Sequence, residues 1–141
     1  MDKRFVLAWV VVFVLWMLAG FVVHGTLLGA DYARLGSLFR PPEEAKGYIG
    51  FLLLAHALMA GAFVWIYRQG VVDKPFLGQG VRYGIAVAFL TAIPTYLIYY
   101  AVQPLGRRLV LKQIVLDSIV TVILGVVVAW LHRDEAGRKS A

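Results

Sequence analysis

The sequence predicts an all-α protein: a four-helix transmembrane bundle, up-down-up-down, with a short interfacial helix in the first loop. Composition leads to this prediction, since 61% of the 141 residues are hydrophobic and only 16% are charged. Soluble domains are closer to half apolar and a quarter charged. The apolar residues also gather in four stretches, each long enough for a helix of about 20 residues to cross a membrane.

The four helices are predicted at about residues 5–28, 48–67, 81–102 and 109–131. They form one domain over residues 1–133, and a polar tail at 134–141 follows. The connection from Gln103 to Arg108 is short, so the last two helices pack as an antiparallel hairpin. Pro94 lies in the middle of the third helix and predicts a kink, because proline has no N–H to donate.

The first connection is the longest, and its pattern is that of a short helix lying in the membrane interface. Apolar side chains alternate with Arg34 and Arg40 at amphipathic spacing. Pro41-Pro42 then ends this helix, because proline clashes with the preceding turn. The apolar positions are Tyr32, Leu35, Leu38 and Phe39.

Charge predicts the orientation and excludes some functions. The net charge is +6, but the basic residues flank the helices, where they meet anionic lipid head groups. No exposed basic stripe with aromatics is present, which argues against nucleic-acid binding. With the N-terminus inside, eight basic residues face the cytoplasm and six face outward, so both termini are predicted to be cytoplasmic. The absence of cysteine excludes thiol redox chemistry, disulfides and iron–sulfur clusters.

Polar residues recur on one face of each predicted helix. Gln113 and Asp117 are four apart on the fourth helix, and Thr95 and Tyr99 are four apart on the third. Residues four apart share a helix face, and polar groups within a membrane usually face the bundle interior. The first two helices add one histidine each at a similar depth. The sequence therefore predicts a polar pocket in the outer half of the membrane, formed by His24, His56, Thr95, Tyr99, Gln113 and Asp117.

Several kinds of chemistry suit this set. A carboxylate beside histidine serves proton relay, cation binding or the orientation of a metal or haem ligand. His24, His56 and Asp117 have the right ligand types for a divalent metal, and two imidazoles suit haem, although no signature spacing accompanies them. The alternative is a structural network, because polar side chains often hydrogen-bond between membrane helices without another role.

Basic residues gather near the outer ends of the helices. They form a candidate rim above the polar pocket that suits anionic lipid head groups, or a solvated collar that anchors the bundle. The rim consists of Arg34, Arg40, Arg107, Arg108 and Lys112.

Two short motifs carry a resemblance. The run His24-Gly25-Thr26-Leu27-Leu28-Gly29, together with Gly78-Gln79-Gly80 and Tyr83-Gly84, resembles a family of small uncharacterised four-helix bacterial inner-membrane proteins. The resemblance implies four helices and a bacterial inner membrane. It implies no activity and no catalytic residues.

The functional hypothesis is a small integral inner-membrane protein that acts as a binding or accessory subunit. It packs against itself or a larger membrane complex. Two alternatives stay open: a small proton- or cation-linked carrier or channel, and a haem- or metal-binding membrane protein. Nothing in the sequence indicates an enzyme, since it contains no nucleophile elbow, phosphate loop or zinc-protease spacing.

Overall fold

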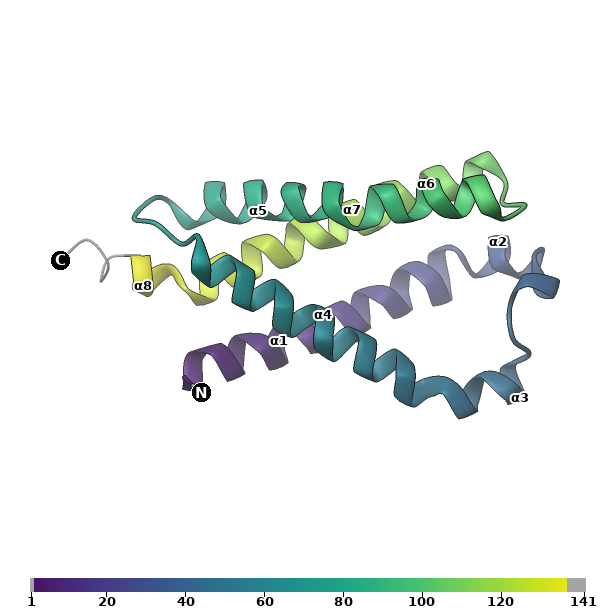
Figure 1. The fold of residues 1–141 in the computed structure, drawn as a ribbon, viewed down its shortest axis with the longest axis horizontal. Coiled ribbons are helices and arrows are strands. Elements are labelled where there is room, and N and C mark those ends of the chain that lie inside the picture. Colours follow the sequence, from purple (N-terminus) through teal and green to yellow (C-terminus); the bar gives the residue numbers. More distant parts are fainter. Residues whose placement is uncertain (1, 137–141) are drawn as a thin grey trace.

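The computed structural model describes residues 2–136, and these residues form helices and connecting turns without any strand. Four segments are long and apolar enough to cross a membrane, which confirms the all-α prediction and indicates a multi-pass membrane protein. In Figure 1 the first and the last described helical residues lie toward the same end of the elongated molecule. The four segments are Lys3–Leu27, Gly36–Gln69, Phe76–Val102 and Arg107–Leu131.

The first segment is not uniform along its length. Helix α1 (Lys3–Gly20) continues into a π-helix, η1 (Phe21–Leu27), which Leu28 closes by donating its N–H to the Val23 carbonyl at 2.9 Å. At the other end Asp2 caps α1, and its carboxylate also pairs with Arg68 at 2.9 Å. The backbone N–H of Arg4 and the Arg68 guanidinium lower the pKa of Asp2. The start of α1 is thus tied to the end of the second segment.

The first loop differs from the single interfacial helix that the sequence predicts. It contains two short helices, α2 (Gly29–Ala33) and α3 (Pro42–Ala45), and two 3₁₀ turns, η2 (Gly36–Leu38) and η3 (Lys46–Tyr48). Leu35 leaves the helical region, with φ −113° and ψ 28°, directly before Gly36. Glycine and the Pro41-Pro42 pair disfavour a continuous helix here. Helix α4 (Ile49–Gln69) follows.

The third segment is broken into α5 (Phe76–Leu90) and α6 (Ala92–Val102). The break lies at Thr91, with φ −120° and ψ −74°, three residues before the proline that predicts a kink. Pro94 has no N–H for the Leu90 carbonyl, so the helix can bend at this point. Helix α5 begins earlier than predicted, because Pro75 precedes its first residue and favours a helix start. The Gln79 side-chain amide also fixes the preceding loop, since it donates to the Val72 and Lys74 carbonyls at 2.8 and 2.7 Å.

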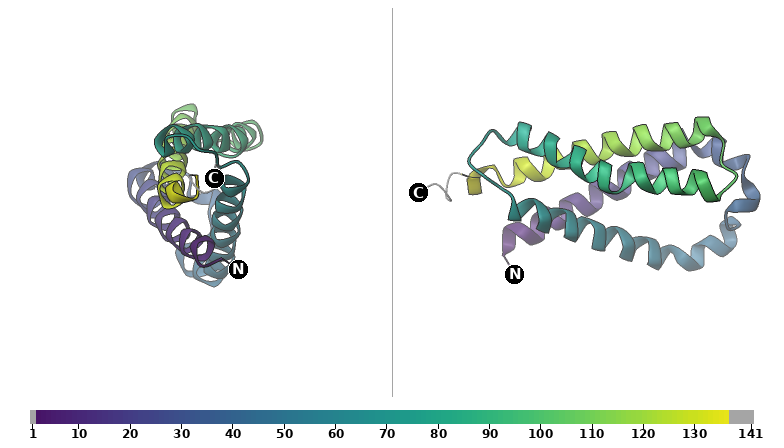
Figure 2. Two further views of the ribbon diagram at one scale, coloured as in Figure 1. Left: turned by 90° about the vertical axis from the view of Figure 1, so that its left-hand side faces the viewer. Right: turned by 45° about the horizontal axis from the view of Figure 1, so that its top comes forward.

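Helix α7 (Arg107–Leu131) is the centre of the molecule, with α5, α6 and α1 packed against it (Figure 2). The closest approach is between α5 and α7. A Cβ atom built on Gly84 would lie 2.4 Å from the Val122 Cα, and one on Gly125 would lie 2.4 Å from the Gly80 carbonyl oxygen. The spacing Gly80-x-x-x-Gly84 therefore permits direct backbone contact, as small residues do at membrane helix interfaces.

Helices α1 and α4 cross each other, as Figure 1 shows. At the crossing the Trp9 indole donates to the Ala57 carbonyl at 2.7 Å, and its ring covers Gly61. Toward its N-terminal end α4 diverges from the other helices, and nearly all side chains from Ile49 to Met59 are exposed. Beyond α7, Arg133–Ala136 forms the short helix α8, and the rest of the predicted tail lies outside the described residues.

Candidate functional site

Asp117 is the centre of a polar network within the predicted membrane region. It lies on the third turn of α7, and its side chain is 21% exposed. One carboxylate oxygen, Oδ1, is 3.3 Å from His24 Nε2, and the other, Oδ2, accepts a hydrogen bond from the Tyr96 hydroxyl. Three separate elements, η1, α6 and α7, therefore meet at one carboxylate.

The π-helix places His24 for this contact. A π-helix holds one residue more per turn than an α-helix, which turns the following side chains around the axis, and such segments recur at functional sites. Within η1, His24 points toward α7, and its second ring nitrogen, Nδ1, is 2.7 Å from the Tyr32 hydroxyl. Both nitrogens of this ring are thus engaged inside the protein.

Tyr32 and Gln113 extend the network toward the loop end of the molecule. The Tyr32 ring stacks on the His24 imidazole, with the two planes 24° apart, and its hydroxyl accepts a hydrogen bond from Gln113 Nε2 at 3.0 Å. Burial raises the pKa of Tyr32, so its hydroxyl keeps its proton at neutral pH. The short helix α2 carries this tyrosine back over the end of the first membrane segment.

The directions of these bonds follow from the donors available. Tyr96 donates to Oδ2 of Asp117, and in the tautomer with a proton on Nε2 the His24 ring donates to Oδ1. In that tautomer Nδ1 is an acceptor, and it accepts a hydrogen bond from the Tyr32 hydroxyl. Gln113 donates to the Tyr32 oxygen. The result is one continuous chain of donors that ends at Asp117.

A cavity of about 590 Å³ adjoins this network. It has three tyrosines, two glutamine amides and one imidazole in its wall, together with three apolar side chains. Aromatic rings with a few convergent polar groups are typical of small-molecule sites. The lining residues are His24, Tyr32, Leu38, Phe39, Tyr96, Tyr99, Gln103, Leu105 and Gln113.

The predicted pocket residues are only partly brought together. His24, Gln113 and Asp117 belong to the network, and Tyr99 lies at the cavity wall with its ring 6.4 Å from that of Tyr96. Thr95 is exposed and does not line the cavity. His56 lies elsewhere: its Nδ1 donates to the carbonyl of Leu52 at 2.9 Å, within its own helix.

Two members of the network, Tyr32 and Tyr96, were not among the predicted pocket residues. Tyr96 lies one turn after Ala92, the residue of α6 that is buried against the bundle. A small residue such as Ala92 marks a helix face that packs closely against a neighbour, so it could have indicated that Tyr96 also faces inward. No comparable feature marked Tyr32, because the residues around it have the amphipathic spacing of a helix in the membrane interface.

The residues predicted as ligands of haem or a divalent metal have different partners. Both His24 nitrogens have protein partners, and among residues 2–136 no hydrogen bond or ion pair joins His56 to Asp117 or to that imidazole. Within residues 2–136, no three side chains of His, Cys, Asp or Glu gather as a metal-binding group.

The predicted basic rim is divided between two places. Lys112 pairs with Asp31 at 2.7 Å, beside the exposed Arg107 and Arg108 at the start of α7. Arg40 instead turns toward the start of α4, where it pairs with Glu44 and lies 3.8 Å from the centre of the Tyr48 ring.

No protein-family model, no curated protein and no solved structure matches the chain. The interpretation of the site therefore depends on its own chemistry.

Proposed function

We propose that this chain is a small multi-pass protein of a bacterial inner membrane, with up-down-up-down helices and both termini in the cytoplasm. Its polar cavity lies in the outer half of the membrane, where it binds a small polar ligand. The protein acts as a binding or accessory subunit, alone or within a larger membrane complex.

One observation carries this proposal: the cavity of about 590 Å³ shares its wall with a network centred on a carboxylate inside a membrane segment. Ionisable groups at such depth are costly and are kept mainly where they have a role. The wall offers phenol, amide and imidazole groups next to the apolar Leu38 and Phe39. This combination suits a small molecule that has both a flat apolar body and hydrogen-bonding groups.

Blocking the cavity should remove its ligand. Leu38 is 41% exposed and lines the cavity, so Leu38→Trp adds bulk there without touching the hydrogen-bonded network. Native mass spectrometry of the mildly solubilised protein should show a bound small molecule or partner that this variant loses.

Leu77→Trp is the matched control, because Leu77 is 56% exposed on α5 and does not line the cavity. This variant should keep the bound species. A native protein that carries neither ligand nor partner, or equal loss in both variants, contradicts the proposal.

A proton-linked carrier is the second candidate, and one observation favours it. The Gln113 carbonyl oxygen, Oε1, is buried and has no hydrogen-bond partner among the described residues. If His24 takes up a proton, its Nδ1–H donates to the Tyr32 oxygen, and the Tyr32 hydroxyl needs an acceptor. Rotation of the Gln113 amide supplies Oε1 for this purpose. The network therefore has two complete hydrogen-bonding arrangements that differ by one proton.

Proton flux tests this candidate. Liposomes containing the protein and a pH-sensitive dye should acidify under an imposed potential, and Asp117→Asn should lower the rate by an order of magnitude or more. The amide cannot accept from both His24 and Tyr96, since one of its two positions is a donor. His56→Gln is the control and should leave the rate unchanged, because His56 bonds only within α4. Equal rates in Asp117→Asn and the native protein exclude this mechanism.

A further inference from the structure

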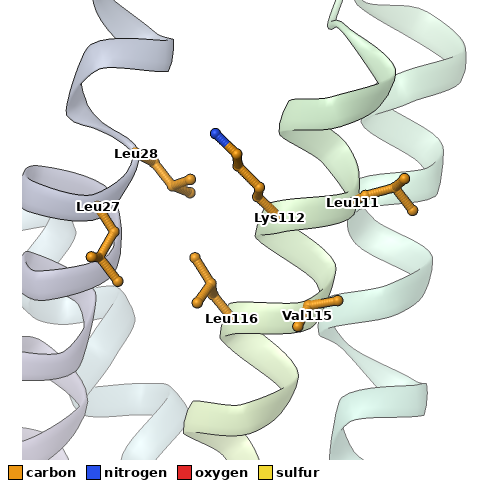
Figure 3. A pocket seen from close by; sticks show the side chains of 6 residues that line it. All are labelled: Leu27, Leu28, Leu111, Lys112, Val115 and Leu116. Atoms are coloured by element: carbon orange, nitrogen blue, oxygen red, sulfur yellow. The ribbon is translucent and has the colours of Figure 1, made fainter.

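A second cavity, separate from the polar pocket, lies between the end of η1 and the first turns of α7 (Figure 3). Its volume is about 490 Å³, and it shares no lining residue with the polar cavity. Leu28 is buried on its inner side, whereas Leu27, Leu111 and Val115 are more than half exposed. Leu116 and Lys112 complete the wall, so the lining is leucine and valine apart from Lys112.

The position of this groove decides what kind of molecule suits it. Its apolar walls belong to two segments that are long and apolar enough to cross a membrane, Lys3–Leu27 and Arg107–Leu131, together with the adjoining Leu28. At that depth the surrounding solvent is lipid, and an apolar groove between helices matches a hydrocarbon chain rather than a polar solute. In Figure 3 the Lys112 side chain rises from α7 toward the loop end of the groove, with its amine at the tip.

The mouth of the groove carries an excess of positive charge. Lys112 Nζ bridges to Asp31 Oδ2 at 2.7 Å, which joins α7 to α2 above the groove. Arg108 lies one turn before Lys112 on α7 and so shares its helix face. Arg34 caps the C-terminal end of α2, three residues after Asp31. Both arginines are exposed, and no carboxylate among residues 2–136 pairs with either of them. The chain near this ion pair thus carries three cations, Arg34, Arg108 and Lys112, and one carboxylate, Asp31.

We propose that this groove binds an anionic phospholipid. One acyl chain lies against Leu28 and Leu116, and the phosphate contacts Arg108 and Lys112 at the mouth. Cationic side chains next to an acyl groove favour a lipid with net negative charge over a zwitterionic one, because the latter carries its own cation. The inference depends on the chain crossing a membrane, and it is independent of what the polar cavity binds.

Native mass spectrometry with defined lipids tests the inference. Protein in mild detergent is titrated with phosphatidylglycerol or with phosphatidylcholine of the same acyl chains. We expect clear preference for phosphatidylglycerol, and Arg108→Gln should lower its retention roughly five-fold, the change that corresponds to the loss of one basic residue near a lipid phosphate. Lys74→Gln removes an exposed cation at the opposite end and should retain the lipid as the native protein does.

A second variant tests the groove itself. Leu27 is 55% exposed, so Leu27→Trp should fold normally while its ring occupies the groove, and it should lose phosphatidylglycerol as well. Equal binding of the two lipids, or equal loss in Arg108→Gln and Lys74→Gln, overturns the inference. Unchanged retention in Leu27→Trp overturns it too, because the acyl chain then lies elsewhere.

Discussion

Gly84→Ala should destabilise the protein by about 3 kcal/mol, near the upper end of the range for overpacked cores. The new methyl group would lie 2.4 Å from the Val122 Cα and 2.8 Å from the Thr121 carbonyl oxygen. Both are backbone atoms, so no side chain can rotate away to make room. The helices α5 and α7 must therefore separate along their closest contact. Unfolding of the solubilised protein with increasing sodium dodecyl sulfate measures this change.

Gly78→Ala provides the matched control on the same helix. No atom lies within 4 Å of a Cβ built at Gly78, so the methyl group meets open space. Alanine favours a helix over glycine by up to about 1 kcal/mol, so this variant should be neutral or slightly more stable. If both variants unfold alike, the contact between α5 and α7 is not as close as described.

The positions of the membrane segments could be predicted from the sequence because membrane thickness fixes their length. Four apolar stretches of sufficient length leave almost no other assignment for the chain. The close contact of α5 with α7 depends on Gly80 and Gly84, whose four-residue spacing permits helices to approach closely in membranes. In contrast, the short helices of the first loop depend on local turns at Gly36 and Pro41-Pro42, which an amphipathic pattern does not resolve.

The composition of the polar site was harder to predict, because it depends on how each helix is turned about its axis. Residues four apart lie on one face of a helix only while the helix is regular. Within α6 the face turned toward the bundle contains Ala92 and Tyr96, so Tyr96 contacts Asp117 while Thr95, one residue earlier, is exposed. The π-helix shifts His24. On the regular helix α7, the predicted face with Gln113 and Asp117 does point into the network.

Asp117→Leu should cost about 2 kcal/mol, although a single hydrogen bond between membrane helices contributes only about 0.6 kcal/mol. The larger figure arises because the substitution leaves two donors, the Tyr96 hydroxyl and His24 Nε2–H, without an acceptor. The remaining exposure of the carboxylate, 21% of the side chain, keeps the cost below that of a fully buried charge.

The double variant Asp117→Leu with Tyr96→Phe distinguishes this explanation from simple loss of packing. Removing the stranded hydroxyl should recover about 1 kcal/mol, so that the double variant is more stable than Asp117→Leu alone. Tyr96→Phe by itself should be destabilising, because Asp117 then loses a donor. Detergent unfolding of the four proteins gives the coupling energy directly. If the two substitutions change the free energy of unfolding additively, Asp117 and Tyr96 are not coupled. The described hydrogen bond between them would then contribute nothing to stability.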